Sequence, residues 1–188
     1  TIAREKGLEP LAALIFEQTG MDLRLKSEEF VNEQVPSVED AVAGASDIIA
    51  EWISEDEKAR KSMRLLYERE AVIFSKVIKG KEAEGIKFSD YYEWSELLRK
   101  CPSHRLLAML RGEEEGFLRL SLEPEEGNAH DLLESIFIKS ENESSEVVAV
   151  ALKDSWKRLL SPSMESEFRN ISKKKADEEA IRVFADNL

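Results

Sequence analysis

The stretch of this chain best suited to binding chemistry is a basic segment followed at once by aromatic residues. Lysines at positions 76, 79 and 81 lie within Ser75-Lys-Val-Ile-Lys-Gly-Lys81, and Lys87 comes shortly after. Aromatic residues follow at Phe88, Tyr91, Tyr92 and Trp94. Single-stranded nucleic acid binds such surfaces because cations neutralise phosphates while rings stack on bases. The pattern is compatible with a nucleic-acid interface, for which the candidate residues are Lys76, Lys79, Lys81, Lys87, Arg99, Lys100, Arg105 and Arg111.

The same aromatic residues also suit a packed core. Their spacing is compatible with one face of a helix, and a buried helix face is the commoner use of such a pattern. Acidic residues dilute the positive charge of the segment, namely Glu82, Glu84, Asp90, Glu93 and Glu96. Core packing is therefore our main interpretation, with direct nucleic-acid binding as the alternative. For Lys173–Lys175 we favour a solvated face or an interdomain contact.

Other reactive residue types are isolated in the sequence. His104 and His130 have no metal-ligand spacing to each other or to Cys101, the single cysteine. One cysteine can form neither an intrachain disulfide nor a cysteine-based zinc site. We predict a capping or surface role for both histidines. For Cys101, just before Pro102 at a helix entry, we predict a buried or half-buried thiol rather than one activated by a helix dipole.

Two acidic runs, Glu113–Glu115 and Glu125–Glu126, resemble metal ligands but lack convergent spacing. Consecutive residues on a helix point about 100° apart, so solvated helix ends are the better interpretation. The sequence contains no Gly-rich phosphate loop, no Gly-x-Ser-x-Gly turn and no His-Glu-x-x-His pair. We predict a protein that is not an enzyme and has no metal or other cofactor.

The overall composition is that of a charged, helix-rich globular chain. Hydrophobic residues make up 42% and charged residues 35%, and the formal net charge is −12. Such a surface repels phosphates on average, which restricts any nucleic-acid contact to a local basic patch. No apolar run has the roughly 18–20 residues that a membrane span requires. The single cysteine suits a reducing compartment, and we predict a cytoplasmic protein without membrane contact.

Hydrophobic periodicity predicts a mainly α fold, a multi-helix bundle with a small two-stranded antiparallel β ribbon. In the first part of the chain helices are expected over residues 8–19, from Ser37 as N-cap, and over 57–70. The β-branched run 71–78 and the alternating run 116–122 are the two strands, paired antiparallel. Further helices are expected from Pro102 to Gly112, over 125–138 and around 148–159. Pro162 is expected to break the chain before a final helix that starts near Ser163.

We expect one module over residues 1–188, with 1–70 and 71–188 as its potential subdomains. Thr1 stands where an initiator Met would be, and Leu188 ends inside a helical pattern. The chain is therefore expected to be a segment of a longer, multidomain protein.

Several runs together resemble the Tex family of bacterial transcription accessory proteins. They are TIAREKGLEPLA, FVNEQVPSVEDAVAGASDIIAEWISED, SKVIKGKEAEGIKFSDYYEWSE, PSHRLLAMLRGEEEGFLRLSLEP and KADEEAIRVFADNL. They cover well over half of the chain in the order of the family. The resemblance implies the central helical region, just upstream of an RNase H-like domain, in a protein that also carries helix-hairpin-helix and RNA-binding OB-fold domains.

The resemblance further implies a role in transcription and RNA metabolism, with nucleic acid (RNA, and DNA as an option), neighbouring domains and the transcription machinery as partners. No family motif assigns a catalytic residue to this region. Our main hypothesis is therefore a non-catalytic helical scaffold that positions the nucleic-acid-binding domains of the parent. The alternative is a module that contacts nucleic acid directly through its basic and aromatic patch.

Overall fold

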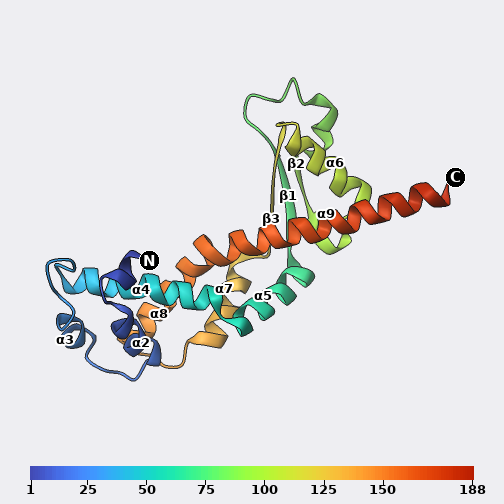
Figure 1. Ribbon diagram of the computed structural model, residues 1–188. Helices are drawn as coiled ribbons and strands as arrows, with labels where there is room; N and C mark the ends of the chain where they lie inside the picture. The colour runs from blue at the N-terminus through green and yellow to red at the C-terminus, as the bar shows by residue number, and fades with distance from the viewer. The chain divides into compact units, whose positions relative to one another are not determined.

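The computed structural model describes all residues 1–188, and the chain folds into nine α-helices and one three-stranded sheet (Figure 1). The helices are α1 (Ile2–Glu5), α2 (Glu9–Glu17), α3 (Leu23–Glu28), α4 (Val38–Glu55), α5 (Glu57–Glu70), α6 (Ser103–Glu114), α7 (Glu126–Phe137), α8 (Glu143–Ser155) and α9 (Ser161–Asp186). The strands are β1 (Val72–Val77), β2 (Glu93–Leu97) and β3 (Leu118–Glu123). Shorter turns are η1 (Ile86–Tyr91), η2 (Leu98–Lys100) and the π-helical η3 (Trp156–Leu160). No helix combines the length and apolar character needed to cross a membrane.

The chain forms two compact units, each built from two separate segments. Unit 1 contains residues 1–63 and 127–162, and unit 2 contains residues 64–126 and 163–188. The single module over residues 1–188, with subdomains 1–70 and 71–188, stays a prediction.

Unit 1 is a helical bundle centred on α4. Its buried face carries the small and β-branched residues Ala41, Ala45, Ile48, Ile49 and Ile53. These pack against α2 and α8 (Figure 1). Ser37 is the N-cap of α4, as predicted, because its hydroxyl accepts a hydrogen bond from the Asp40 N–H at 3.1 Å. Within the bundle Trp156 is only 3% exposed, whereas Trp52 is half-buried edge-on to Phe16.

A buried glutamine fixes the connection between α7 and α8 in unit 1. Gln18 ends α2 in the left-handed conformation, with φ 55°. Its side chain donates to the Phe137 carbonyl and accepts from the Lys139 N–H, both at 2.8 Å. Its carbonyl accepts from Asn142, the N-cap of α8, at 3.0 Å. These bonds hold the start of α8 in place.

Unit 2 is organised around the sheet, whose strand order is β2-β1-β3 with both pairs antiparallel. One sheet face packs against α6 and η1. Its core consists of Ile73, Phe88, Leu106, Met109, Leu118, Leu120, Leu122 and Ala176. The antiparallel pairing of β1 with β3 confirms the prediction. The two-stranded ribbon is wrong, because β2 adds a third strand on the other side of β1.

The prediction of a break at Pro162 is also wrong. The π-helical turn η3 follows α8, and α9 begins at Ser161, so Pro162 is the second residue of a 26-residue helix. The backbone stays helical from α8 through η3 into α9, since Trp156 and Ser161 both have right-handed helical dihedrals, so Pro162 lies inside a continuous helical run. The π-helical turn directly before Pro162 departs from the regular i→i−4 hydrogen-bond pattern that a proline would disrupt, and this accommodates the residue without ending the helix.

Candidate nucleic-acid interface

The eight basic residues selected from the sequence all belong to unit 2, but they occupy different parts of it. Lys76 projects from β1 on the sheet face that α6 does not cover, whereas Lys79 and Lys81 lie just beyond the end of β1. Arg99 and Lys100 form η2, beyond the opposite end of the β1–β2 pair. Five strand residues span about 17 Å at ~3.3 Å per residue, so these groups are separated by the length of the sheet.

Four of the eight are engaged in contacts within the chain. The Arg105 guanidinium donates to both carboxylate oxygens of Glu96, at 2.9 and 2.8 Å. Lys87 contacts Glu115 at 3.1 Å, and Lys81 contacts Glu84 at 3.4 Å. Arg99 donates from Nε to the Arg69 carbonyl at 3.1 Å. These contacts compete with phosphate for the same donors.

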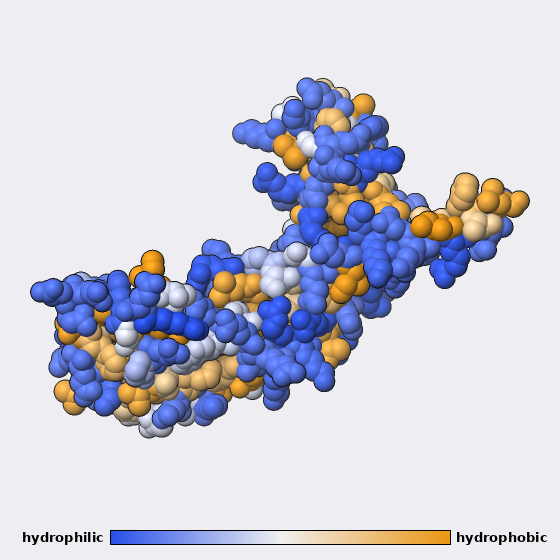
Figure 2. Space-filling model, viewed as in Figure 1, coloured by the Kyte–Doolittle hydropathy of each residue, from blue (hydrophilic) through white to orange (hydrophobic).

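Lys87 and Arg111 border a groove of about 1050 Å³ within unit 2, formed by η1, α6 and the end of α9. Its lining includes Glu114, Asp177 and Glu179 alongside the cations. The lining is therefore of mixed charge. Figure 2 shows apolar side chains gathered on the last turns of α9.

Trp94, Glu96, Cys101 and Arg105 form one cluster on the core side of the sheet. The guanidinium of Arg105 lies 5.0 Å from the centre of the Trp94 ring. Burial raises the pKa of Glu96, but hydrogen bonds from Arg105 and neighbouring groups outweigh it, so this pKa lies below its ordinary value. Burial and the adjacent Glu96 carboxylate raise the pKa of Cys101 to about 12. Cys101 is half-buried, as predicted, and its raised pKa favours the protonated thiol at neutral pH.

The aromatic residues of the predicted patch pack against the core. Phe88 is 6% exposed and belongs to the core cluster. Tyr91, Tyr92 and Trp94 are partly buried against it. Core packing is thus confirmed for these rings, although they reach it from a 3₁₀ turn and a strand rather than from one helix.

A basic pair that the sequence analysis did not identify lies on the open face of the sheet. Lys76 of β1 is directly opposite Arg119 of β3, and both side chains are exposed. Phe74, 37% exposed, is on the same face, because alternate residues of a strand point the same way. Arg119 stands alone between Leu118 and Leu120, so only the alternation of β3, combined with its register against β1, reveals the pair.

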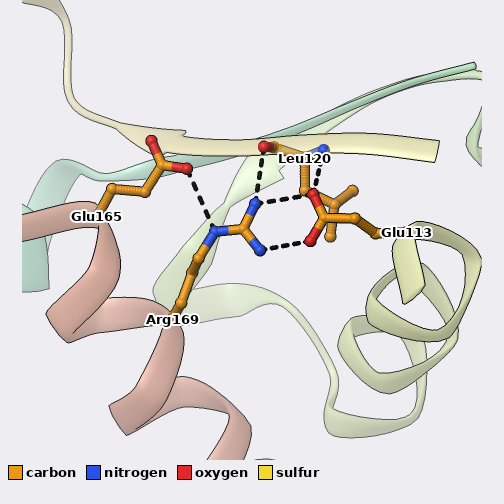
Figure 3. Close-up of polar contacts among 4 residues, drawn as sticks. All are labelled: Glu113, Leu120, Glu165 and Arg169. Atoms are coloured by element: carbon orange, nitrogen blue, oxygen red, sulfur yellow. Dashed lines mark hydrogen bonds and ion pairs between the residues drawn. The ribbon is translucent and has the colours of Figure 1, made fainter. Parts of the chain in front are cut away.

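A network centred on Arg169 of α9 links three elements of unit 2 (Figure 3). Arg169 donates to both oxygens of Glu113 on α6, at 2.5 and 2.9 Å, and to the Leu120 carbonyl at 2.8 Å. Glu113 accepts from the Leu120 N–H at 2.9 Å. Glu165 receives a further bond from Arg169 Nε at 3.2 Å. The pair is bidentate, the strongest geometry for a guanidinium and a carboxylate.

This network satisfies the outward-facing backbone groups of Leu120 at the free edge of β3. An unpaired strand edge is a template for pairing with other chains, and here Glu113 and Arg169 occupy that position. Burial raises the pKa of Glu113, but the bonds from Arg169 and Leu120 outweigh it and leave this pKa below its ordinary value. The prediction of a solvated acidic run over Glu113–Glu115 is wrong for Glu113, because this carboxylate is paired with Arg169. No sequence pattern relates the two residues.

Groups suited to metal binding do not converge in the structure. No group of three or more His, Cys, Asp or Glu side chains is placed to hold a metal ion. His104 is exposed on α6, where it borders the groove of unit 2. Neither His104 nor His130 belongs to a group of side chains that could hold a metal ion.

Together these features define a helical module in two units, one of which carries a small antiparallel sheet with a sealed edge. The family model described as "Tex central region-like" matches residues 21–184. The chain belongs to this family.

Named relatives cover the whole or nearly the whole of the chain. The transcriptional accessory protein Tex of Neisseria gonorrhoeae is 34% identical over 200 residues, covering 100% of this chain and 26% of the relative. Protein tex of Bordetella pertussis is also 34% identical, over 204 residues, with the same coverage. The human S1 RNA-binding domain-containing protein 1 is 26% identical over 204 residues, covering 99% of this chain and 20% of the relative. The chain thus spans about a quarter of the length of its bacterial relatives.

Proposed function

We propose that this chain is a non-catalytic positioning module of a protein that acts in transcription and RNA metabolism. The names of the relatives, a transcriptional accessory protein and an S1 RNA-binding domain protein, support this role for the parent. In the parent, we infer, other domains bind the nucleic acid, and the helices of this module hold those domains in place.

The observation that carries the proposal is the dispersal of the basic residues. Lys79 and Lys81 are separated from Arg99 and Lys100 by the length of the sheet. Arg105 is bound to Glu96 and stacked on Trp94. Nucleic-acid affinity depends on several cations neutralising adjacent phosphates. In this arrangement the cations are too far apart to act together on adjacent phosphates.

Binding of single-stranded RNA tests the proposal directly. A labelled 20-nucleotide RNA is titrated with the 188-residue chain by fluorescence anisotropy at about 50 mM salt. We expect a dissociation constant no tighter than about 10⁻⁴ M, the weak end of non-specific binding. In the full-length parent, the pair Lys79→Glu and Lys81→Glu should leave RNA affinity unchanged within about twofold. A salt-sensitive micromolar affinity of the chain, lost in that double variant, would refute the positioning role.

A second candidate function is direct binding of single-stranded nucleic acid on the open sheet face. The observation that favours it is the cross-strand pair of Lys76 and Arg119 beside the exposed Phe74 ring. Two cations and one ring supply a phosphate contact and a stacking surface. Glu93, opposite Lys76 on β2, and Glu123 on β3 limit the positive charge of this face.

The double variant Lys76→Glu with Arg119→Glu isolates this second candidate. If the open face binds RNA, the dissociation constant should rise at least about tenfold. The matched control is Lys58→Glu with Lys61→Glu, two exposed lysines on α5. Equal effects of the two double variants would indicate loss of general charge rather than of a site.

A further inference from the structure

Unit 1 contains an open groove between α4 and α8, and none of the eight basic residues discussed above lines it. It measures about 650 Å³. The lining comes from α3, α4, α8 and η3, and its apolar part includes Val42, Val147 and Val150.

The floor of this groove is apolar and exposed to solvent. Val42 and Val147 are half-buried, and Val150 is 65% exposed. The buried faces of the same helices, with Ile48 on α4 and Leu152 on α8, already form the core of unit 1. Val150 therefore contributes apolar surface that the fold itself does not require.

The charged side chains around the floor are acidic except for one. Asp47, Glu143, Glu146 and Asp154 line the groove, and Arg158 is its only cation. Arg158 donates to both oxygens of Asp154, at 2.7 and 2.6 Å, so these two charges cancel and the net negative charge of the lining comes from Asp47, Glu143 and Glu146.

Local helix stability accounts for only part of this acidity. Glu143 and Glu146 lie in the first turn of α8, where carboxylates stabilise the helix dipole. Asp154 is explained by its i,i+4 ion pair with Arg158, whereas Asp47 lies in the middle of α4, away from the helix N-terminus. The remaining carboxylates, Asp47 on α4 and Glu143 and Glu146 on α8, therefore border the groove from both helices.

The groove is held open by buried polar contacts. The Ser155 hydroxyl, wholly buried, donates to the Ala50 carbonyl at 2.6 Å and fixes α8 against α4. Asn142 bonds both Gln18 and the Ser145 N–H, which fixes the first turn of α8. A preformed groove loses little conformational entropy on binding.

We propose that this groove binds a cationic amphipathic helix of a partner protein. The lining of α8 extends from Glu143 to Asp154, about 17 Å at 1.5 Å per residue, which matches three helical turns. Apolar side chains at every third or fourth position of the partner cover Val42, Val147 and Val150. Its flanking lysines or arginines pair with Asp47, Glu143 and Glu146. Phosphate-bearing ligands are repelled by the same rim. The proposal does not depend on the positioning role of the module.

The probe is a fluorescein-labelled peptide of about 15 residues with a leucine stripe at helical spacing and lysines beside it. A matched peptide has every lysine replaced by glutamate, and a third has the same composition in scrambled order. Each is titrated against the 188-residue chain by anisotropy at two salt concentrations. We expect micromolar affinity for the cationic amphipathic peptide alone, weaker at the higher salt concentration.

Substitutions in the chain locate the binding site. Val150→Arg should weaken binding at least about tenfold. Val150 is exposed, so the substitution should leave the fold intact, which circular dichroism checks. Asp47→Asn preserves side-chain size and should weaken binding about threefold with a smaller salt dependence. Ile171→Arg, a comparably exposed position of α9 that does not line the groove, is the control and should change nothing.

Three results would overturn the proposal. The first is equal binding of the lysine and glutamate peptides, and the second is unchanged affinity in both Val150→Arg and Asp47→Asn. The third is a dimer of the chain, seen by light scattering and broken by Val150→Arg, since the occupant of the groove would then be a second copy.

Discussion

Arg169 of α9 and Glu113 of α6 share two hydrogen bonds, of 2.5 and 2.9 Å, although 56 positions separate them in the chain. Their side chains are only 25% and 29% exposed. Leu120 contacts both partners through its backbone. The pair therefore connects two helices and one strand edge of unit 2, and its loss would leave a half-buried carboxylate without its main partner.

Arg169→Gln should destabilise unit 2 by about 1–3 kcal/mol, because charged hydrogen bonds of a partly buried group are lost. The measurement is the free energy of unfolding from urea titration, followed by intrinsic fluorescence. Arg158→Gln is the matched control, since it breaks a bidentate i,i+4 pair with Asp154 whose side chains are more exposed, at 50% and 35%. That change should cost about 0.3–0.5 kcal/mol. Equal losses in the two variants would mean that the Arg169 network contributes no more than a surface pair.

Acidification should weaken unit 2 through Glu113 and Glu96. The pKa of each carboxyl in the folded state lies below its ordinary value. Their contribution is therefore complete above the pKa of the unfolded chain, about 4.3, and is lost as pH falls toward the folded-state pKa. Glu123, whose pKa is raised mainly by burial, acts in the opposite sense and partly offsets the loss.

The urea midpoints of the wild-type chain and of Glu113→Gln, measured from pH 7.5 to 3.5, test this pH dependence. The difference between the two midpoints should shrink as pH falls. Protonation removes the negative charge of Glu113 from the wild type at low pH, whereas Glu113→Gln lacks that charge at every pH. A difference that stays constant over this range would contradict the lowered pKa of Glu113.

Cys101 should react slowly with alkylating reagents. With its pKa raised to about 12, the thiolate that attacks the reagent is scarce at pH 8. The rate of modification by iodoacetamide, measured by mass spectrometry, should be at least about tenfold below that of an unstructured cysteine peptide. Glu96→Gln should accelerate the reaction, because Glu96 raises the pKa of the thiol. A rate equal to that of the peptide would show that the thiol is neither buried nor paired.

Gly112 should tolerate no side chain. A Cβ atom at this position of α6 would lie 2.4 Å from Leu118 Cδ1 and 3.2 Å from Phe88 Cδ1. Gly112→Ala should therefore cost about 1–3 kcal/mol through overpacking. Gly127→Ala is the control, because no atom lies within 4 Å of its added Cβ and alanine suits α7 better. It should be neutral or stabilise by up to about 1 kcal/mol in the same unfolding assay.

Local patterns in the sequence predicted most helices and two of the three strands. The alternation of Leu118, Leu120 and Leu122 predicted β3, and Ser37 predicted the start of α4. Strand β2 was not predicted, because Trp94 lies among polar residues and its spacing from Tyr91 also fits a helix. The register against β1, rather than intrinsic propensity, makes this segment a strand.

The candidate interface was less predictable than the fold. Basic residues that are neighbours in sequence, such as Lys81 and Lys87, are paired with different glutamates in space. Conversely, Lys76 and Arg119 lie opposite each other across two strands but 43 positions apart. A search for basic residues close together in the sequence finds Lys81 and Lys87, but only the pairing of the strands brings Lys76 and Arg119 together.

The two-segment composition of each unit has a practical consequence for deletion mapping. Unit 1 needs residues 127–162 as well as 1–63, and unit 2 needs 163–188 as well as 64–126. A truncation at a single point between these segments removes one of the two segments of a unit and leaves the other segment without its packing partner. Loss of activity in such a truncated protein would report a broken fold, so domain roles in this region are better assigned by point substitutions or by internal excision of 64–126 together with the terminal helix.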